Sequence, residues 1–338
     1  VFALAIGANT TVFSVFNGLF LRPLPYPDGD RLVMVYDSYP KMGLENVGTA
    51  IPDYIERREQ APSLENLAII ANQALTLAGD GPPERVGVGI ASASLFDVLR
   101  VAPVLGRVFT ANEEEQGNER VVVLSHALWR SRFGEQPGII DSSIRFDGNS
   151  YRVIGVMPEG FGFPSLNVGA YVPFVFTPRQ RSDAARGNQF SQSVGRLRDG
   201  ATVDGLNSEL ATIVERNVAA GRVEAEDVTV AGFTGRAKPL RDLQVGSLRE
   251  TLLILQAVVL VVLMIACANL ANLQLTRLAA RRKELAVRAA LGAAGGRIVT
   301  MVLVEALLLA LIGGVLGVAV AWGGLTLVRA LGLDRSSA

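Results

Sequence analysis

The chain has 338 residues, of which 49% are hydrophobic, and its 32 basic and 32 acidic side chains cancel to a formal net charge of zero. Its single cysteine, Cys267, excludes an intrachain disulfide, so a hydrophilic domain must be stabilised by its own core. The zero is a cancellation: residues 22–250 hold 24 basic and 29 acidic residues (net −5), and residues 277–297 hold six basic and one acidic (net +5). Opposite signs suit opposite sides of a membrane.

The first 21 residues form an uncharged run that ends at Arg22 and a proline-rich stretch. We do not expect this run to be a signal peptide, because it has no basic n-region and proline replaces the small residues of a cleavage site. We expect residues 1–21 to be the later part of a first transmembrane helix, since a second span needs a partner crossing to place residues 22–250 outside. A buried amphipathic helix is the alternative, because the run contains Asn9, Thr10 and Ser14.

The long hydrophilic portion predicts an α+β domain of two subdomains. Alternating apolar residues and turn signals predict strands at Leu32–Tyr36, Arg85–Ile90, Val121–Leu124, Ile144–Phe146 and Tyr151–Val156. Helical spacing predicts helices at Pro52–Gln60, Ser94–Arg100, His126–Phe133 and Thr202–Val218. Thr202 is placed to cap the last of these. Strands and helices alternate without a repeated βαβ period, which favours an α+β module over a doubly wound sheet.

Motifs for common chemistry are absent from the sequence. The lysines, Lys41, Lys238 and Lys283, do not follow the glycine pattern of a phosphate-binding loop, so the chain cannot hydrolyse ATP by that route alone. The sole histidine, His126, excludes a histidine-based metal cluster and is expected to be structural. The acidic run Glu113–Glu115 could attract a cation, but such a run is usually a solvated surface. We expect no catalytic residue, no bound cofactor or metal, and no nucleic-acid partner.

Two long apolar segments follow the hydrophilic portion. Thr251–Thr276 contains no charge and Ile298–Val328 contains only Glu305, and each exceeds the roughly 20 residues that span a bilayer. The basic loop between them is expected in the cytoplasm by the positive-inside rule. The predicted domains are transmembrane helix 1 (1–21), the outer α+β domain (22–248), transmembrane helix 2 with a preceding stalk (249–276), the cytoplasmic loop (277–297), transmembrane helix 3 (298–330) and a truncated end (331–338).

The basic loop has the pattern of a short amphipathic helix. Glu284 and Arg288 are four residues apart and form a favourable pair. Gly292 begins a glycine-rich turn that ends the helix and returns the chain to the membrane. Such a helix can offer its arginines to anionic lipid or to a soluble partner, and the spacing alone does not decide between the two.

The third apolar segment contains a small-residue face and one charge. Gly313, Gly317 and Ala321 lie four residues apart, which indicates a helix–helix or dimer contact, although ordinary glycine usage in membranes gives the same pattern. Glu305 is the ionisable residue within this span, and burying it unpaired is costly. It is expected either to pair with a loop arginine or to take part in transmitting movement.

Several long motifs resemble one family of membrane transporters. One set of motifs resembles the FtsX-type permease domain of MacB-like ABC transporters. It consists of Ile265–Arg277, Arg281–Ala293, Glu305 and Gly313–Gly314. A second set of motifs resembles the MacB-like periplasmic core domain, most closely that of the duplicated orphan permeases of acidobacteria. It consists of Gly7–Ser14, Leu21–Pro27, Leu124–Gly134 and Tyr151–Phe161. The motifs cover nearly the whole chain in the family's order.

The resemblance implies an α-helical membrane protein with a large α+β extracytoplasmic (periplasmic) domain in the bacterial inner membrane. In this family the helix between the second and third spans contacts a separate ATPase, so ATP is used by that partner. The ATPase-coupling residues are then Arg281, Arg282, Lys283, Glu284, Arg288 and Gly292. The expected partners are a cytoplasmic ABC ATPase subunit, a second permease half (dimer or duplicated half) and membrane lipids. Because family members have four helices per half, the chain resembles a fragment of such a permease.

The function implied is that of a permease subunit coupling ATP hydrolysis by a separate ATPase to movements of the periplasmic domain, for export or mechanotransmission. The alternative is a non-transporting membrane scaffold or signalling module that regulates a periplasmic partner, since orphan members often lack an adjacent ATPase. The sequence does not identify a transported substrate.

Overall fold

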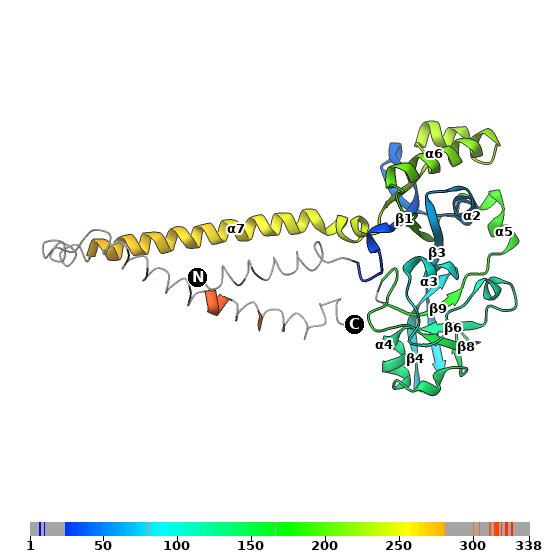
Figure 1. Cartoon of the computed structure of the whole chain (residues 1–338), viewed down its shortest axis with the longest axis horizontal. Coiled ribbons are helices and arrows are strands. Elements are labelled where there is room, and N and C mark those ends of the chain that lie inside the picture. Colours follow the sequence, from blue (N-terminus) through cyan, green and yellow to red (C-terminus); the bar gives the residue numbers. More distant parts are fainter. Residues whose placement is uncertain are drawn as a thin grey trace. The chain divides into compact units, whose positions relative to one another are not determined.

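The computed structural model describes residues 24–79, 81–165 and 167–280, together with Gly7, Thr10 and separate positions between 300 and 326. Residues 23–244 form one compact unit, and residues 1–22 and 245–335 form another. The first unit mixes strands and helices (Figure 1). The predicted large α+β domain is therefore confirmed.

Eleven strands of this domain form one sheet. They are β1 (Leu32–Tyr39), β2 (Leu44–Gly48), β3 (Leu64–Gly79), β4 (Gly81–Ala91), β5 (Leu105–Gly106), β6 (Val121–Leu124), β7 (Ser143–Phe146), β8 (Asn149–Val156), β9 (Val168–Pro173), β10 (Gln192–Leu197) and β11 (Thr234–Pro239). The order is β11-β1-β10-β3-β4-β9-β6-β8-β5, with β2 beside β1 and with β7 beside β3 and β8. The pairs β4–β9 and β6–β8 are parallel and the others are antiparallel.

The helices of the described chain are α2 (Ile51–Gln60), α3 (Ser94–Leu99), α4 (His126–Phe133), α5 (Pro178–Arg181), α6 (Val203–Ala219) and α7 (Leu240–Ala280). The predicted cap of α6 is confirmed, because the Thr202 hydroxyl accepts a hydrogen bond from the Gly205 amide at 3.1 Å. Helix α3 ends one residue before its predicted end. Arg100 adopts a left-handed backbone (φ 54°), which cannot continue a right-handed helix.

The longest strand, β3, is not predicted by the sequence pattern. Its first half is buried on both faces: Leu67 and Ile69 pack into the core beneath α2 and α6, and Ala68 and Ile70 pack into the core beside α3. A strand buried on both sides loses the alternation of polar and apolar residues that identifies a half-exposed strand. The sequence pattern also does not predict strands β2, β9, β10 and β11.

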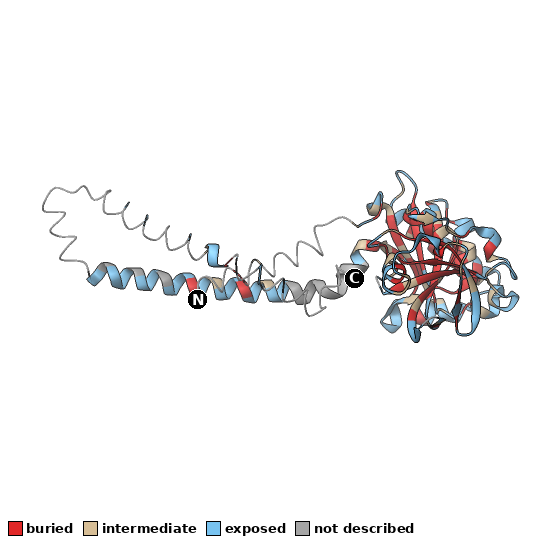
Figure 2. Cartoon of the chain, turned by 90° about the horizontal axis from the view of Figure 1, so that it is seen from below, coloured by how far each residue is buried: buried red, intermediate tan, exposed pale blue. Residues whose placement is uncertain are grey.

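Three apolar clusters hold the domain together, and its buried residues concentrate around the sheet (Figure 2). One cluster lies between the sheet and α2 and α6, a second lies around α3 and Phe161–Phe163, and a third packs α4 against β6, β8 and β9. Strand β3 contributes to all three, through Leu67, Ile70 and Leu77 respectively. The sheet is therefore continuous through every part of the core.

Within the described residues, one helical stretch has the length and composition of a membrane span. It is Leu253–Arg277 in α7, with 25 residues and a mean hydropathy of 2.6. It matches the predicted second apolar segment, and α7 continues to Ala280, past the predicted start of the loop. The predicted spans at 1–21 and 298–330 lie almost wholly outside the described residues, so the three-span arrangement stays a prediction.

The central position of β3 gives a first testable prediction. Leu67→Ala should lower the free energy of unfolding by about 2–5 kcal/mol, because Leu67 is fully buried and its truncation leaves a cavity. Gln73→Ala on the exposed part of the same strand should change it by less than about 0.5 kcal/mol. Urea unfolding followed by fluorescence measures both, and equal effects would contradict the assignment of β3 as the core strand.

Candidate functional site

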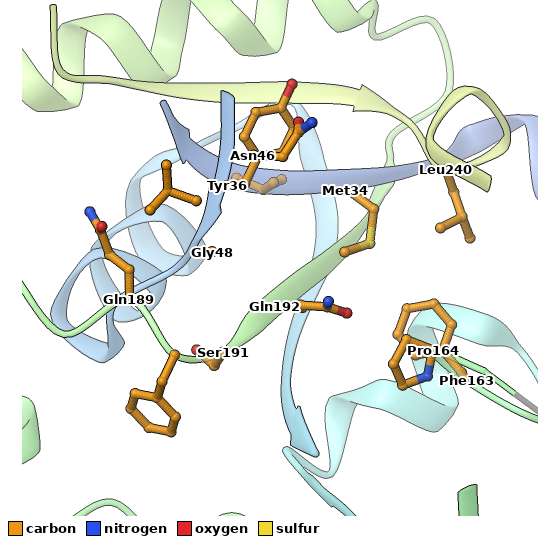
Figure 3. A pocket seen from close by; sticks show the side chains of 13 residues that line it. Met34, Tyr36, Asn46, Gly48, Phe163, Pro164, Gln189, Ser191, Gln192 and Leu240 are labelled. Carbon is orange, nitrogen blue, oxygen red and sulfur yellow. The ribbon is translucent and has the colours of Figure 1, made fainter. Parts of the chain in front are cut away.

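The outer domain has a cavity on the sheet face opposite α2 and α6. Val33 and Val35 of β1 point into the core beneath these helices, so the intervening Met34 and the following Tyr36 face the other side. On that side the sheet is covered only in part, and a cavity of about 480 Å³ remains. Its lining residues are Met34, Val35, Tyr36, Asn46, Val47, Gly48, Phe163, Pro164, Gln189, Phe190, Ser191, Gln192 and Leu240 (Figure 3).

Hydrogen bonds fix both walls of this cavity. On one side the buried Tyr171 hydroxyl accepts from the Phe163 amide at 2.9 Å and donates to the Phe163 carbonyl at 3.1 Å. On the other side Ser191 donates its hydroxyl to the Thr49 carbonyl at 2.6 Å, and the Thr49 amide donates to the Ser191 carbonyl at 2.8 Å. Gly48 has φ 104°, and a Cβ there would lie 2.5 Å from the Gln189 carbonyl oxygen. The cavity is therefore shaped before any ligand binds.

The lining of the cavity carries no carboxylate, ammonium, guanidinium, imidazole or thiol. A charged pair lies outside the lining, where the Lys238 ammonium lies 3.1 Å from a Glu45 carboxylate oxygen. Lys238 also lies 5.9 Å from the centre of the Tyr36 ring. Burial raises the pKa of Tyr36, so its hydroxyl stays neutral. The polar side chains of the lining are therefore hydroxyls and carboxamides.

A buried ionic cluster holds the segment that leads to the cavity wall. Arg186, between α5 and β10, pairs with Asp53 at 2.5 Å and with Glu56 at 2.6 Å, both on α2. Arg57 of the same helix pairs with Asp37 of β1, and both are almost fully buried. Burial raises the pKa of Asp53 to about 6, against the opposing effects of Arg57 and Arg186. We interpret the cluster as structural, because its charges are directed at one another and not into the cavity.

A second arginine fixes the point where the chain enters the domain. Arg196 of β10 is 1% exposed and donates to the carbonyls of Pro27 at 2.9 Å, Asp28 at 3.0 Å and Val98 at 2.8 Å. Burial lowers the pKa of Arg196, and the nearby Arg100 and Arg31 lower it further. The guanidinium thus ties the incoming segment to the sheet and to α3.

The chain leaves the domain beside the point where it enters. In the antiparallel pair β1–β11, Val33 at the start of β1 lies opposite Pro239 at the end of β11. Helix α7 begins at the next residue, Leu240. The segment preceding the domain and the helix following it are therefore attached to two neighbouring strands.

The acidic run differs from the predicted solvated surface. Glu113 is 7% exposed, pairs with Arg107 at 2.6 Å and accepts hydrogen bonds from the Thr110 amide and hydroxyl. Burial raises the pKa of Glu113, but these hydrogen bonds outweigh it and hold the pKa at about 2. Only Glu115 of the run is exposed as predicted, because Glu114 is half-buried and accepts from the Ala93 amide at 2.5 Å. The carboxylate of Glu113 thus stabilises a turn.

The predicted coupling and membrane residues fall mostly outside the described part of the chain. These are Arg281, Arg282, Lys283, Glu284, Arg288, Gly292, Glu305, Gly313 and Ala321. Gly317 is described, and it is buried within the helical stretch 314–317.

His126 is the first residue of α4, and its ring meets the Trp129 ring edge-on, with 5.4 Å between the ring centres. Among the described residues, no group of three or more His, Cys, Asp or Glu side chains could hold a metal ion.

Curated proteins similar to the chain are ABC transporter permeases. An uncharacterized ABC transporter permease, YknZ of Bacillus subtilis, is 25% identical over 231 residues, which are 67% of this chain and 54% of that protein. The macrolide export ATP-binding/permease protein MacB of Mannheimia succiniciproducens is 23% identical over 320 residues, 92% of this chain and 44% of that protein. The chain thus spans about half the length of these relatives.

Two family models agree with this class, and a solved structure shares the fold. A domain of a putative permease protein from Porphyromonas gingivalis has a TM-score of 0.50 at 16% identity, covering 63% of this chain and 92% of that one, and it shares the fold. Residues 2–213 match the model of the MacB-like periplasmic core domain, and residues 257–336 match that of the FtsX-like permease C-terminal region. The chain belongs to the MacB-like periplasmic core domain family and is a permease of the MacB/FtsX type. The resemblance seen in its sequence is confirmed.

The Arg196 contacts predict a measurable loss of stability. Arg196→Met should lower the free energy of unfolding by about 2–4 kcal/mol, because buried carbonyls lose a charged donor. Arg198→Met is the matched control, since Arg198 is exposed and donates to the Pro62 carbonyl alone. Urea unfolding compares the two variants, and an equal, small effect of both would show that Arg196 is not a structural clamp.

The Glu113 contacts predict how stability depends on pH. The folded-state pKa of about 2 lies below the ordinary value of 4.5, so the unfolded chain binds more protons between pH 2 and 4.5. The free energy of unfolding should therefore rise with pH across this window. The stabilisation contributed by Glu113 should be lost as the pH falls through it. Glu113→Gln should flatten this rise, whereas Glu115→Gln at an exposed position should leave it unchanged. Urea unfolding at pH 2.5, 3.5 and 6 tests this, and an undiminished rise in Glu113→Gln would contradict it.

Proposed function

We propose that the chain is a force-transmitting permease subunit, in which ATP hydrolysis by a separate cytoplasmic ATPase moves the outer domain for export or mechanotransmission. The observation that supports it most directly is the attachment of the incoming segment and of α7 to paired strands, with Val33 opposite Pro239. Movement of either connection acts first on β1 and β11. Because β1 also pairs with β10, the movement then reaches β3 and the rest of the sheet.

Helix α7 provides the connection through which the force travels. It runs without interruption from Leu240 to Ala280 and contains the candidate membrane span Leu253–Arg277. At 1.5 Å per residue, a helix of 41 residues is about 60 Å long. A continuous helix transmits axial displacement because its backbone hydrogen bonds resist stretching. In this proposal the domain 22–248 is periplasmic and the loop 277–297 is cytoplasmic, as the charge distribution predicts.

The ATPase-facing surface is assigned to Arg281, Arg282, Lys283, Glu284, Arg288 and Gly292. These residues form the basic helix predicted between the second and third spans. A cytoplasmic ABC ATPase subunit binds there and uses ATP, while the chain itself binds no cofactor. A second permease half completes the assembly, with Gly313, Gly317 and Ala321 as a packing face and membrane lipids around it. Glu305 either pairs with a loop arginine or contributes to transmission.

Charge reversal tests this assignment. Arg281→Glu combined with Arg288→Glu should reduce complex formation with the ATPase and its stimulation by at least about tenfold, which corresponds to ~1.4 kcal/mol of lost interaction. Arg179→Glu combined with Arg216→Glu, at exposed positions of α5 and α6, is the matched control and should have no effect. Co-purification from membranes and ATPase assays in lipid nanodiscs measure both quantities.

Two outcomes contradict the proposal in different ways. If the doubly reversed variant stimulates the ATPase as the unaltered chain does, the coupling surface is wrongly assigned. If no ATP-binding subunit co-purifies with the unaltered chain, the non-transporting scaffold or signalling module is favoured instead.

A further inference from the structure

The cavity beside β1, β2 and β10 has the properties of a ligand site. Its volume of about 480 Å³ lies within the roughly 300–1,000 Å³ of sites that bind small molecules. Its walls are held by the hydrogen bonds of Tyr171 on one side and of Ser191 and Thr49 on the other. Because the cavity is already formed, less conformational entropy is lost when a ligand binds.

The charge of the lining selects for a neutral ligand. None of the thirteen lining residues is charged, although residues 22–250 hold 53 charged side chains. A charged ligand group would lose water there without gaining a partner, which is costly. The nearby Lys238 is already paired with Glu45 at 3.1 Å and so offers little net charge to an anion.

The polar side chains of the lining determine which hydrogen-bonding groups a ligand should carry. Among the described residues, Asn46 and Gln192 are exposed and their carboxamides have no protein hydrogen-bond partner, and both line the cavity (Figure 3). A carboxamide offers donors and acceptors together, so a matching ligand must present both. Amides do so, whereas esters and ethers only accept, so they can pair with the NH₂ donors but leave the carboxamide carbonyl oxygens without a donor.

The apolar side chains define the rest of the ligand. Met34, Phe163, Phe190 and Leu240 also line the cavity, and Phe190 remains 47% exposed although its ring lies 6.1 Å from that of Phe174. An apolar or aromatic group in the cavity would cover Phe190 and Met34 from water. We propose that this cavity binds an uncharged ligand that carries an amide group next to an apolar side chain. The inference concerns binding by the outer domain and is independent of ATPase coupling.

A set of small probes tests this on the full chain in lipid nanodiscs. The probe is N-acetyl-phenylalanine N-methylamide, and its two comparison compounds are the diester methyl O-acetyl-phenyllactate and the cation phenylalanine N-methylamide. Titration by saturation-transfer NMR, with empty nanodiscs as the blank, should show saturable binding of the diamide below 10 mM. The diester and the cation should bind at least about fivefold more weakly, the loss expected for about one hydrogen bond.

Matched variants assign the binding to this cavity. Gln192→Ala and Phe190→Ala should each weaken binding of the diamide at least about threefold. Gln116→Ala and Val104→Ala, at exposed positions away from the cavity, should leave it unchanged. Thermal unfolding curves that match the unaltered chain establish that the variants are folded.

The proposal is overturned by any of three results. These are absence of saturable diamide binding, equal binding of the diamide and the diester, and unchanged affinity in both cavity variants while the proteins remain folded. One outcome is that the doubly reversed Arg281 and Arg288 variant loses ATPase stimulation and still binds the diamide as the unaltered chain does. That result would not contradict the ligand site. The failure of one proposal is therefore distinguishable from the failure of the other.

Discussion

The antiparallel pairing of β1 with β11 is the constraint on which the architecture of the outer domain depends. It places Val33 opposite Pro239, and so brings the beginning and the end of a domain of more than 200 residues onto adjacent strands. Arg196 then fixes the incoming segment by three hydrogen bonds to carbonyl oxygens. With both connections attached to the same end of one strand pair, a movement of either is applied to the sheet and not to a peripheral loop.

The same strand pair connects this attachment to the cavity. Leu240, the first residue of α7, lines the cavity, and Met34 and Tyr36 of β1 form part of its lining. A displacement of β11 relative to β1 would change the distance between Leu240 and these side chains. If this change in distance alters the affinity for a ligand, ligand binding in the cavity and movement of α7 influence each other to the same extent.

The sequence predicted those elements whose signals are local. The α6 helix was predicted with its Thr202 cap, and β7 and β8 were predicted from alternating apolar residues and turn signals, because capping and turn residues act on their immediate neighbours. Strand β3 could not be predicted in this way, because burial on both faces by distant helices removes its alternation. The Glu113 carboxylate was predicted to be solvated, but Arg107 and Thr110 fold back onto it. The cavity was not predicted at all, since it joins residues from Met34 to Leu240 and none of them has a diagnostic chemistry.

In the proposed mechanism, force enters the outer domain through β1 and β11. Hydrogen–deuterium exchange of the full-length protein with its ATPase, compared between the nucleotide-free and the ATP-bound state, tests it most directly. We expect altered protection of amides in Met34–Ser38 and Thr234–Lys238, which are cross-strand partners, with little change in the distant β6 amides Val121–Leu124. Unaltered exchange in both β1 and β11, with ATP bound and the ATPase active, would contradict it.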